Sequence, residues 1–276
     1  MAMSMLTNVS SLGAQRNLAK TSNQVAKNIA RLSSGMRINK SADDAAGLAI
    51  TSKMTAHIRG LSQAKRNAND AISLIQTAEG GLNEINSLLT RMRELSVQAA
   101  TGGTLVTSDR SALDQEFQAL ESEINRIVEV TKYNGQALLN GAISTGVAFQ
   151  VGIINTTNDR VTLSVLSATA TTLGTGSQTL TTAAAAQSAI TAIDDAISNV
   201  ASRRNTLGSA QNRLHVTISN LGSIHENLSA ANSRIRDVDV ATETAEMSRN
   251  QILMQAGVSV LSQANQMPGM ILSLLG

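Results

Sequence analysis

Apolar residues recur every seven positions over a long stretch near the C-terminal end of the chain. The row is unbroken and comprises Ile193, Val200, Leu207, Leu214, Leu221, Leu228 and Ile235. A second row, shifted by four, contains Ile197, Gln211, Ile218 and His225. Apolar residues held to a seven-residue period predict a coiled-coil seam, along which two helices pack. Thr181 or Thr182 can cap the start of this helix.

Similar spacings in the first half of the chain predict the partner helices. Their apolar residues are Leu18, Val25 and Leu32; Ile75, Leu82 and Leu89; and Leu113, Phe117, Leu120, Ile124 and Ile127. The Gly102-Gly103 pair separates the second segment from the third. Thr107 or Ser108 can cap the third segment. We therefore expect a mainly α fold of long antiparallel helices that form a coiled-coil rod.

The middle of the chain has a different pattern. Residues 133–141, "YNGQALLNG", contain two Asn-Gly turn signals, and Val161, Leu163 and Val165 alternate with polar residues after a turn at 155–159. These features predict a small β-hairpin within a section at about 141–180. Residues 167–182 are rich in Thr, Ser and Gly and are expected to form a plain linker, with an exposed, O-glycosylated loop as the alternative. Because the long helix after this section runs back, both chain ends should lie at the same end of the rod.

The two chain ends carry almost no charge. Residues 250–276 and 1–15 contain no charged side chain. The many side-chain amides after residue 250 argue against a membrane span, and Pro268 is expected to interrupt a helix there. Two apolar rows cover the C-terminal stretch, one with Met247, Met254 and Leu261 and the other with Leu253, Val260, Met267 and Leu274. Together these rows are too wide for one partner helix, so the ends are expected to meet a partner molecule.

Composition narrows the possible functions. The chain has 22 Lys and Arg against 20 Asp and Glu, without a basic block or basic–aromatic stripe, so nucleic-acid binding is not expected. It lacks Cys, which excludes disulfides and Cys-based zinc or redox sites. Its aromatic residues are two Phe and one Tyr, although such side chains usually dominate globular cores and enzyme pockets. Long helices packed through Leu, Ile, Val, Met and Ala fit this composition.

Candidate catalytic or metal-binding groups are scattered along the chain: His57, His215 and His225, and the pairs Asp43-Asp44 and Asp194-Asp195. Adjacent residues of a helix point in different directions, so neither Asp pair converges on one ion. Asp43 and Asp44 are better explained by a helix start, where the helix dipole favours negative charge. We therefore expect no enzymatic site, no cofactor and no metal.

Several long motifs resemble those of bacterial flagellins. Near the N-terminus they are "RLSSGMRINKSADDAAGLAI" (31–50), "IRGLSQAKRNANDAISLIQTAEGGLNEI" (58–85) and "RMRELSVQAA" (91–100). Near the C-terminus they are "LGSAQNRL", "NLSAANSRIRDVDVATE" and "QILMQAGVSVLSQANQMPGMILSLL". The resemblance covers roughly residues 1–140 and 185–276, and the large outer variable domains of many flagellins have no room between these regions. Gly81 stands where many relatives have Ala, which predicts a local weak point in its helix.

The resemblance implies how the chain is organised and assembled. Residues 1–43 with 235–276 would form an inner terminal domain whose paired helices are buried by neighbouring subunits and are poorly ordered in the free monomer. Residues 44–234 would form the helical rod domain. The assembly helices would use Leu18, Val25, Leu32, Leu253, Met254, Val260, Leu261, Met267 and Leu274. Contacts with the next subunit, and with the vertebrate Toll-like receptor for flagellin, would use Arg91, Arg93, Glu94, Leu95, Gln98 and Glu116.

The implied function is a structural subunit of the flagellar filament used for swimming motility. Its partners would be other flagellin subunits, a filament cap, hook-junction proteins and an export chaperone. Without a recognisable Sec signal, export through the flagellar type III route to the cell exterior is expected. The alternatives are a hook–filament junction protein, which shares the terminal helices, and another secreted helical assembly protein.

Overall fold

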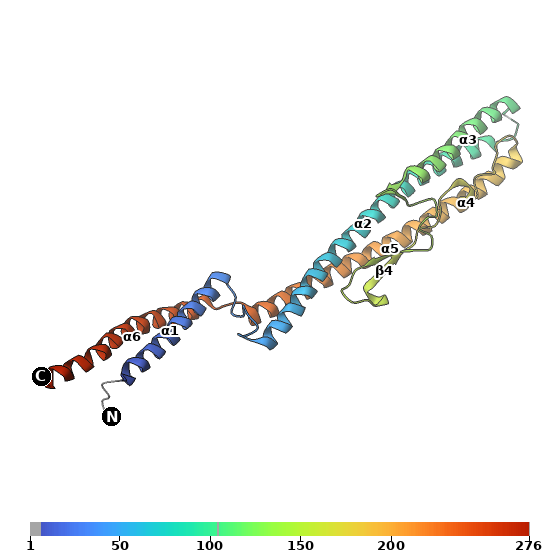
Figure 1. Ribbon diagram of the computed structural model, residues 1–276. Helices are drawn as coiled ribbons and strands as arrows, with labels where there is room; N and C mark the ends of the chain where they lie inside the picture. Colours follow the sequence, from blue (N-terminus) through green and yellow to red (C-terminus); the bar gives the residue numbers. More distant parts are fainter. Residues whose placement is uncertain (1–6, 104, 276) are drawn as a thin grey trace. The chain divides into compact units, whose positions relative to one another are not determined.

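The computed structural model describes residues 7–103 and 105–275, apart from the side chains of residues 268 and 270–275. Its helices are α1 (Val9–Ser34), α2 (Ala45–Ala99), α3 (Thr107–Val130), α4 (Ala170–Leu173), α5 (Ala183–Arg236) and α6 (Val240–Leu275). Between α3 and α4 lie β1 (Lys132–Tyr133), β2 (Gln136–Ala137), β3 (Val147–Gln150), the 3₁₀ helix η1 (Thr157–Asp159) and β4 (Arg160–Leu163). Long helices dominate, with two small antiparallel hairpins, so the predicted fold class is confirmed (Figure 1).

The chain divides into two compact units. The terminal unit comprises Met1–Ala56 with Asn227–Gly276, and the central unit comprises His57–Glu226. The boundaries fall inside α2 and α5, each some distance from the domain limits expected at residues 43–44 and 234–235.

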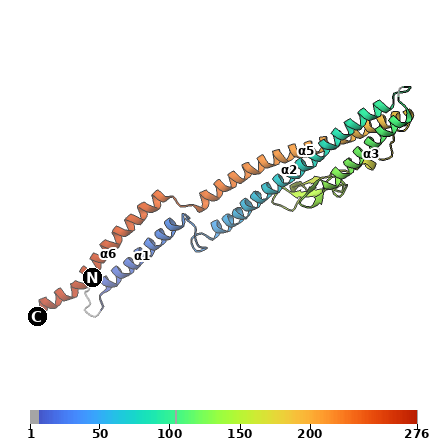
Figure 2. The ribbon, with the colours of Figure 1, turned by 90° about the horizontal axis from the view of Figure 1, so that it is seen from above.

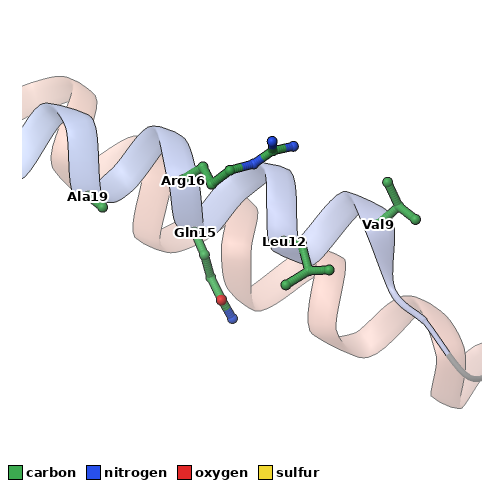
Figure 3. A pocket seen from close by; sticks show the side chains of 5 residues that line it. All are labelled: Val9, Leu12, Gln15, Arg16 and Ala19. Carbon is green, nitrogen blue, oxygen red and sulfur yellow. The ribbon is translucent and has the colours of Figure 1, made fainter.

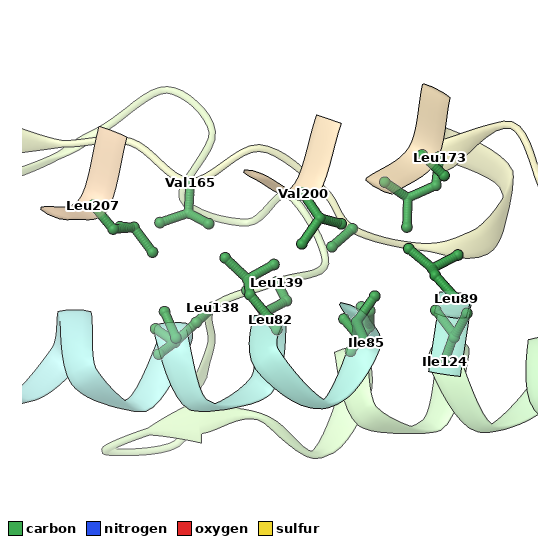
Figure 4. Packing of buried hydrophobic residues seen from close by; sticks show 14 of the residues in the cluster. Leu82, Ile85, Leu89, Ile124, Leu138, Leu139, Val165, Leu173, Val200 and Leu207 are labelled. Atoms are coloured by element: carbon green, nitrogen blue, oxygen red, sulfur yellow. The ribbon is translucent and has the colours of Figure 1, made fainter. Parts of the chain in front are cut away.

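The core of the central unit follows the seven-residue pattern. Helix α2 buries Ile75, Leu82, Ile85, Leu89 and Met92 completely, and α5 opposes it with Ile193, Val200, Leu207 and Leu214. Figure 4 shows Leu82, Ile85 and Leu89 of α2 facing Val200 and Leu207 of α5, with Leu138 and Leu139 packed between them. Ion pairs join Arg93 to Asp194 and Glu79 to Arg204, which shows that the two helices run antiparallel. This part of the predicted seam is confirmed.

The ends and the second row of the seam differ from the prediction. Leu221 is buried, whereas Leu228 and Ile235, which lie in the terminal unit, are half-buried. The second buried row of α5 is shifted by three rather than four, and its buried members are Ala189, Ala196 and Ala210. Ile197, Gln211, Ile218 and His225 are half-buried. Alanine has no long side chain, so it fits where two helix backbones come closest, a position that a search for large apolar residues overlooks.

Helix starts test the predicted caps. The Thr182 hydroxyl accepts a hydrogen bond from the Ala185 amide, as expected for the start of α5. Asp44 caps α2 by accepting from the amide of Gly47 at 2.8 Å, so the interpretation of that Asp is confirmed. The cap predicted for α3 is wrong: its N-cap is Val106, and the carboxylate of Asp109 accepts from the Val106 amide.

The middle section contains more structure than predicted. The expected hairpin is β3–β4, with Val147 opposite Leu163 and Gln150 opposite Arg160. A second hairpin, β1–β2, turns at Asn134 and Gly135, which have φ values of 48° and 80°. Residues 167–182 do not form an exposed linker. They bury Ala168, Ala170, Leu173, Thr175 and Leu180, because the short helix α4 folds this segment onto the core.

Gly81 is not a weak point but a site of close packing. A Cβ at this position would lie 2.7 Å from Thr131 Oγ1 and 2.8 Å from Leu139 Cδ1. The fully buried Leu139 and the end of α3 therefore pack directly on the backbone of α2. The neighbouring Gly80 has no atom within 4 Å of a Cβ built on it.

Candidate assembly surfaces

Helices α1 and α6 of the terminal unit form an antiparallel pair (Figures 1 and 2). The Asn8 amide donates to the Ala264 carbonyl near one end of α1, and the Asn28 amide donates to Glu243 near the other. The residues that face the partner helix recur at alternating steps of three and four, as in a coiled coil. They are Ser11, Ala14, Leu18, Thr21, Val25, Asn28 and Leu32 on α1, and Glu243, Met247, Asn250, Met254, Gly257, Leu261 and Ala264 on α6.

Much of this seam is polar. Asn28 is 1% exposed, donates to Glu243 Oε1 at 2.6 Å and accepts from Asn250 Nδ2 at 3.1 Å. Arg31 lies 3.6 Å from Glu243, which is 6% exposed. At the other end, Ser11 donates to Asn265 at 2.6 Å. Buried polar groups must find partners, so this network fixes the register in which the two helices pair. The sequence analysis missed it because it followed apolar positions.

Large apolar side chains of the terminal unit lie on its surface instead. On α6 the exposed fractions are 66% for Ile252, 52% for Leu253, 53% for Val258, 55% for Val260 and 36% for Met267. Leu253, Val260 and Met267 are seven residues apart and so share one face of the helix. A monomer that exposes such a row of apolar residues presents a surface for association.

Helix α1 contributes a further apolar hollow. It is lined by Val9, Leu12, Gln15, Arg16 and Ala19, and Figure 3 shows these side chains projecting from the ribbon of α1. Val9 is 67% and Leu12 50% exposed. The two helices of the pair therefore both carry unpaired apolar surface.

The predicted assembly residues separate into two groups. Leu18, Val25, Leu32, Met254 and Leu261 lie in the α1–α6 seam, where they are buried or half-buried. Leu253, Val260 and Met267 are exposed, and the side chain of Leu274 lies outside the described residues. Helix α6 continues through Pro268 to Leu275, so the interruption expected there is wrong. Among the described residues of this set, Leu253, Val260 and Met267 are therefore the side chains most accessible to another molecule.

In the central unit, Arg91 joins α2 to α3. Its Nη2 donates to Glu116 at 2.8 Å, and its Nη1 donates to Glu94 at 3.0 Å. The side chain of Arg91 is half exposed, as is that of Glu116. The hydrogen bonds that Arg91 donates to Glu116 and, to a lesser extent, to Glu94 raise the pKa of Arg91 above its ordinary value. The cluster is thus a fixed, fully charged and accessible surface.

The other predicted contact residues, Arg93, Gln98 and Leu95, lie outside the hydrogen-bonded cluster of Arg91, Glu94 and Glu116. Arg93 donates to Asp194 of α5 at 2.7 Å, and this hydrogen bond lowers the pKa of Asp194. Gln98 is exposed beyond Arg91 on α2. Leu95, expected on the same accessible face, is 1% exposed and belongs to the core, because the face of α2 between α3 and α5 is covered by both helices. Leu95 therefore packs in the core beneath the charged cluster and is not available to contact another molecule.

The described residues contain neither a group of side chains that could hold a metal ion nor a helix that could span a membrane. Among residues 7–103 and 105–275, no group of three or more His, Asp and Glu side chains could hold a metal ion. None of the helices searched in that range has a stretch long and apolar enough to span a bilayer.

Comparison with known proteins identifies relatives over nearly the whole chain. Residues 5–144 match the bacterial flagellin N-terminal helical region, and residues 190–275 match the bacterial flagellin C-terminal helical region. The chain is 48% identical to a flagellin of Halalkalibacterium halodurans over 97% of its own length and 98% of the relative's. It is 41% identical to a flagellin of Bacillus subtilis over the same shares.

Solved structures share the fold. The crystal structure of Bacillus cereus flagellin, at 32% identity, matches with a TM-score of 0.50 over 60% of this chain and 94% of that one. A putative flagellar hook-associated protein from Vibrio parahaemolyticus matches with a TM-score of 0.59 over 71% of this chain and all of that one. Since that protein is 16% identical, the likeness shows a common fold alone.

Proposed function

The chain belongs to the bacterial flagellin family, and on that premise we propose the surfaces through which it assembles. It is a structural subunit of the flagellar filament, a self-assembled polymer outside the cell. We propose that the exposed row of Leu253, Val260 and Met267 on α6, with the hollow on α1, is buried by neighbouring subunits in the filament. The exposed fractions of these side chains carry the proposal.

Burial of this row would also stabilise the terminal helices themselves. In the monomer, the α1–α6 seam contains buried polar residues, and large apolar side chains of α6 outside the seam remain in water. Helices gain most of their stability from packing an apolar face, so order in the terminal unit should increase when neighbouring subunits cover it. The terminal unit is thus assigned to assembly, and the central unit to the helical body of the subunit.

Truncation tests this assignment. The full chain should grow into long tubes under salting-out conditions, as seen by negative-stain electron microscopy. A chain that ends after Arg249 lacks the row of α6 and should form none. Tubes from the truncated chain would refute the assembly role of α6, and particles without tubes from the full chain would favour a junction protein, which shares the fold.

A second proposed surface is the charged cluster of Arg91, Glu94 and Glu116, with Gln98 beside it. Arginine is a frequent anchor of protein interfaces, and this one is held in place by two carboxylates. We propose that the cluster contacts the next subunit within the filament and the vertebrate Toll-like receptor for flagellin when the subunit is free. Arg93 and Asp194 border it on the side of α5, and Leu95 supports it from the core.

A reporter-cell assay tests receptor recognition. Purified monomer should activate cells that express the receptor, and Arg91→Ala should raise the half-maximal concentration by roughly 30-fold, as loss of a ~2 kcal/mol anchor would. Arg126→Ala is the matched control, because Arg126 is another exposed arginine of the central unit, paired with Glu123. No response at saturating wild-type monomer, or equal losses in both variants, would refute the proposal.

The other partners follow from the family. We propose export through the flagellar type III route with a chaperone bound to the C-terminal region, and contacts with the filament cap and hook-junction proteins at the filament ends. We propose that the role is structural, as in the flagellins to which the chain is similar. A pull-down with full-length and α6-truncated chain would test whether the chaperone needs the residues after Arg249.

A further inference from the structure

One charged residue occupies a core position of α5. The second buried row of this helix consists of Ala189, Ala196 and Ala210, and seven-residue spacing places Arg203 in the same row. Arg203 is half-buried, between the buried Val200 and Leu207. A cation at a seam position opposes tight packing of the core unless a negative group accompanies it.

The described residues do not supply that negative group. Among the described residues no ion pair includes Arg203, whereas the adjacent Arg204 lies 3.6 Å from Glu79. The Nη1 atom of Arg203 is buried and has no hydrogen-bond partner. Burial lowers the pKa of Arg203, with no neighbouring acid to raise it again. A guanidinium stays protonated even so, and therefore a buried donor and its charge are left unmatched.

Arg203 lines a cavity of about 200 Å³ between α5 and the segment that follows β4. Val165 and Leu207 form its apolar part, and Figure 4 shows both side chains pointing toward α2. Hydroxyl groups come from both sides, with Ser164 after β4 and Ser202 on α5. A third hydroxyl, on Thr206, already donates to the Ser202 carbonyl.

We propose that this cavity binds a small tetrahedral oxyanion of the phosphate type. Arg203, Ser164 and Ser202 all line the cavity, so the guanidinium and the two hydroxyls supply hydrogen-bond donors for such an anion. The apolar lining from Val165 and Leu207 weakens the screening by water and so strengthens the charge interaction. The bound anion joins the segment after β4 to α5 and neutralises the unmatched cation. The site is independent of the filament function.

Nuclear magnetic resonance of the full-length monomer tests the site. Sodium phosphate, titrated to about 50 mM at constant ionic strength with chloride as the balancing anion, should give saturable shifts at Ser164, Ser202 and Arg203, with a Kd in the millimolar range or tighter. Arg203→Met fits the apolar seam and should abolish these shifts. Arg213→Met is the matched control, since Arg213 is exposed on the same helix outside the cavity, and should leave them unchanged.

Thermal unfolding provides a second readout. Phosphate should raise the Tm of wild type and of Arg213→Met relative to chloride, and should leave the Tm of Arg203→Met unchanged. Arg203→Met should itself melt no lower than wild type in chloride, because it removes an unmatched buried charge. Shifts that do not saturate in wild type, or equal responses in wild type and Arg203→Met, would overturn the proposal. Neither result bears on whether the chain assembles into tubes.

Discussion

Gly80 and Gly81 of α2 allow the close packing of Thr131 and Leu139 on Gly81 to be measured as a difference in stability. Replacement of Gly by Ala inside a helix stabilises it by about 0.5–1 kcal/mol, because Ala loses less conformational freedom on folding. Gly80 is exposed with open space around it, so Gly80→Ala should show this gain alone. Gly81→Ala should gain the same amount and lose more than it gains, because its Cβ meets three atoms of Thr131 and Leu139 within 3.0 Å.

The size of the loss follows from the neighbours. Leu139 is fully buried, and the Thr131 hydroxyl already donates to the Ile127 carbonyl at 2.6 Å, so neither side chain moves freely. Overpacking of this kind costs roughly 1–3 kcal/mol. The helix-propensity gain cancels between the two variants. The difference in free energy of unfolding between Gly80→Ala and Gly81→Ala is therefore expected to be about 1–3 kcal/mol.

Urea denaturation of the full-length monomer, followed by circular dichroism, measures this difference, and thermal melts should show it as ~2–4 °C per kcal/mol. In a Thr131→Ala background two of the three close contacts disappear, and the penalty of Gly81→Ala should shrink. Equal stabilisation by Gly80→Ala and Gly81→Ala would refute the close-packing argument. So would an undiminished penalty in the Thr131→Ala background.

Two further predictions concern polar contacts. Arg93→Gln should return the lowered pKa of Asp194 toward 3.8 in a carboxyl-carbon NMR titration. The ion pair between Arg93 and Asp194 stabilises the fold above pH 3.8, and this stabilisation is lost as the pH falls through the folded-state pKa of Asp194. An unchanged pKa of Asp194 in the variant would contradict this role of Arg93. Asn28→Ala should destabilise the α1–α6 pair by about 1–3 kcal/mol, because Glu243 stays buried and loses a hydrogen-bond donor. Unchanged hydrogen exchange of the α1 amides would show that this polar network does not hold the two helices together.

The long helices could be predicted because their stability depends on periodic burial. Ile75, Leu82 and Leu89 face Val200 and Leu207 as their spacing required. The proposed contact residues around Arg91 were harder to predict, since a helix flanked by two others has no simple outer face. Leu95 shares a helix side with Arg91, and yet α3 and α5 cover it.

Other features depended on three-dimensional neighbours that periodicity does not reveal. The role of Gly81 comes from Thr131 and Leu139, which are distant in the sequence. Residues 167–182 have the composition of a linker, but Leu173 and Leu180 anchor them to the core. The exposed row of α6 was visible as an excess of apolar positions, while the choice of the row that faces α1 required the polar partners Asn28 and Glu243.

The central claim is that the exposed row of α6 is an assembly surface, and a double substitution tests it without shortening the helix. Leu253→Asn with Val260→Asn removes apolar surface that is exposed in the monomer, whereas Ser248→Asn with Gln255→Asn adds the same side chains at exposed polar positions of α6. Polymerisation of each chain would be followed by light scattering and electron microscopy. The account predicts tubes from wild type and the control pair, and monomer with unchanged helical content from Leu253→Asn/Val260→Asn. Tubes of normal yield from the latter would contradict it.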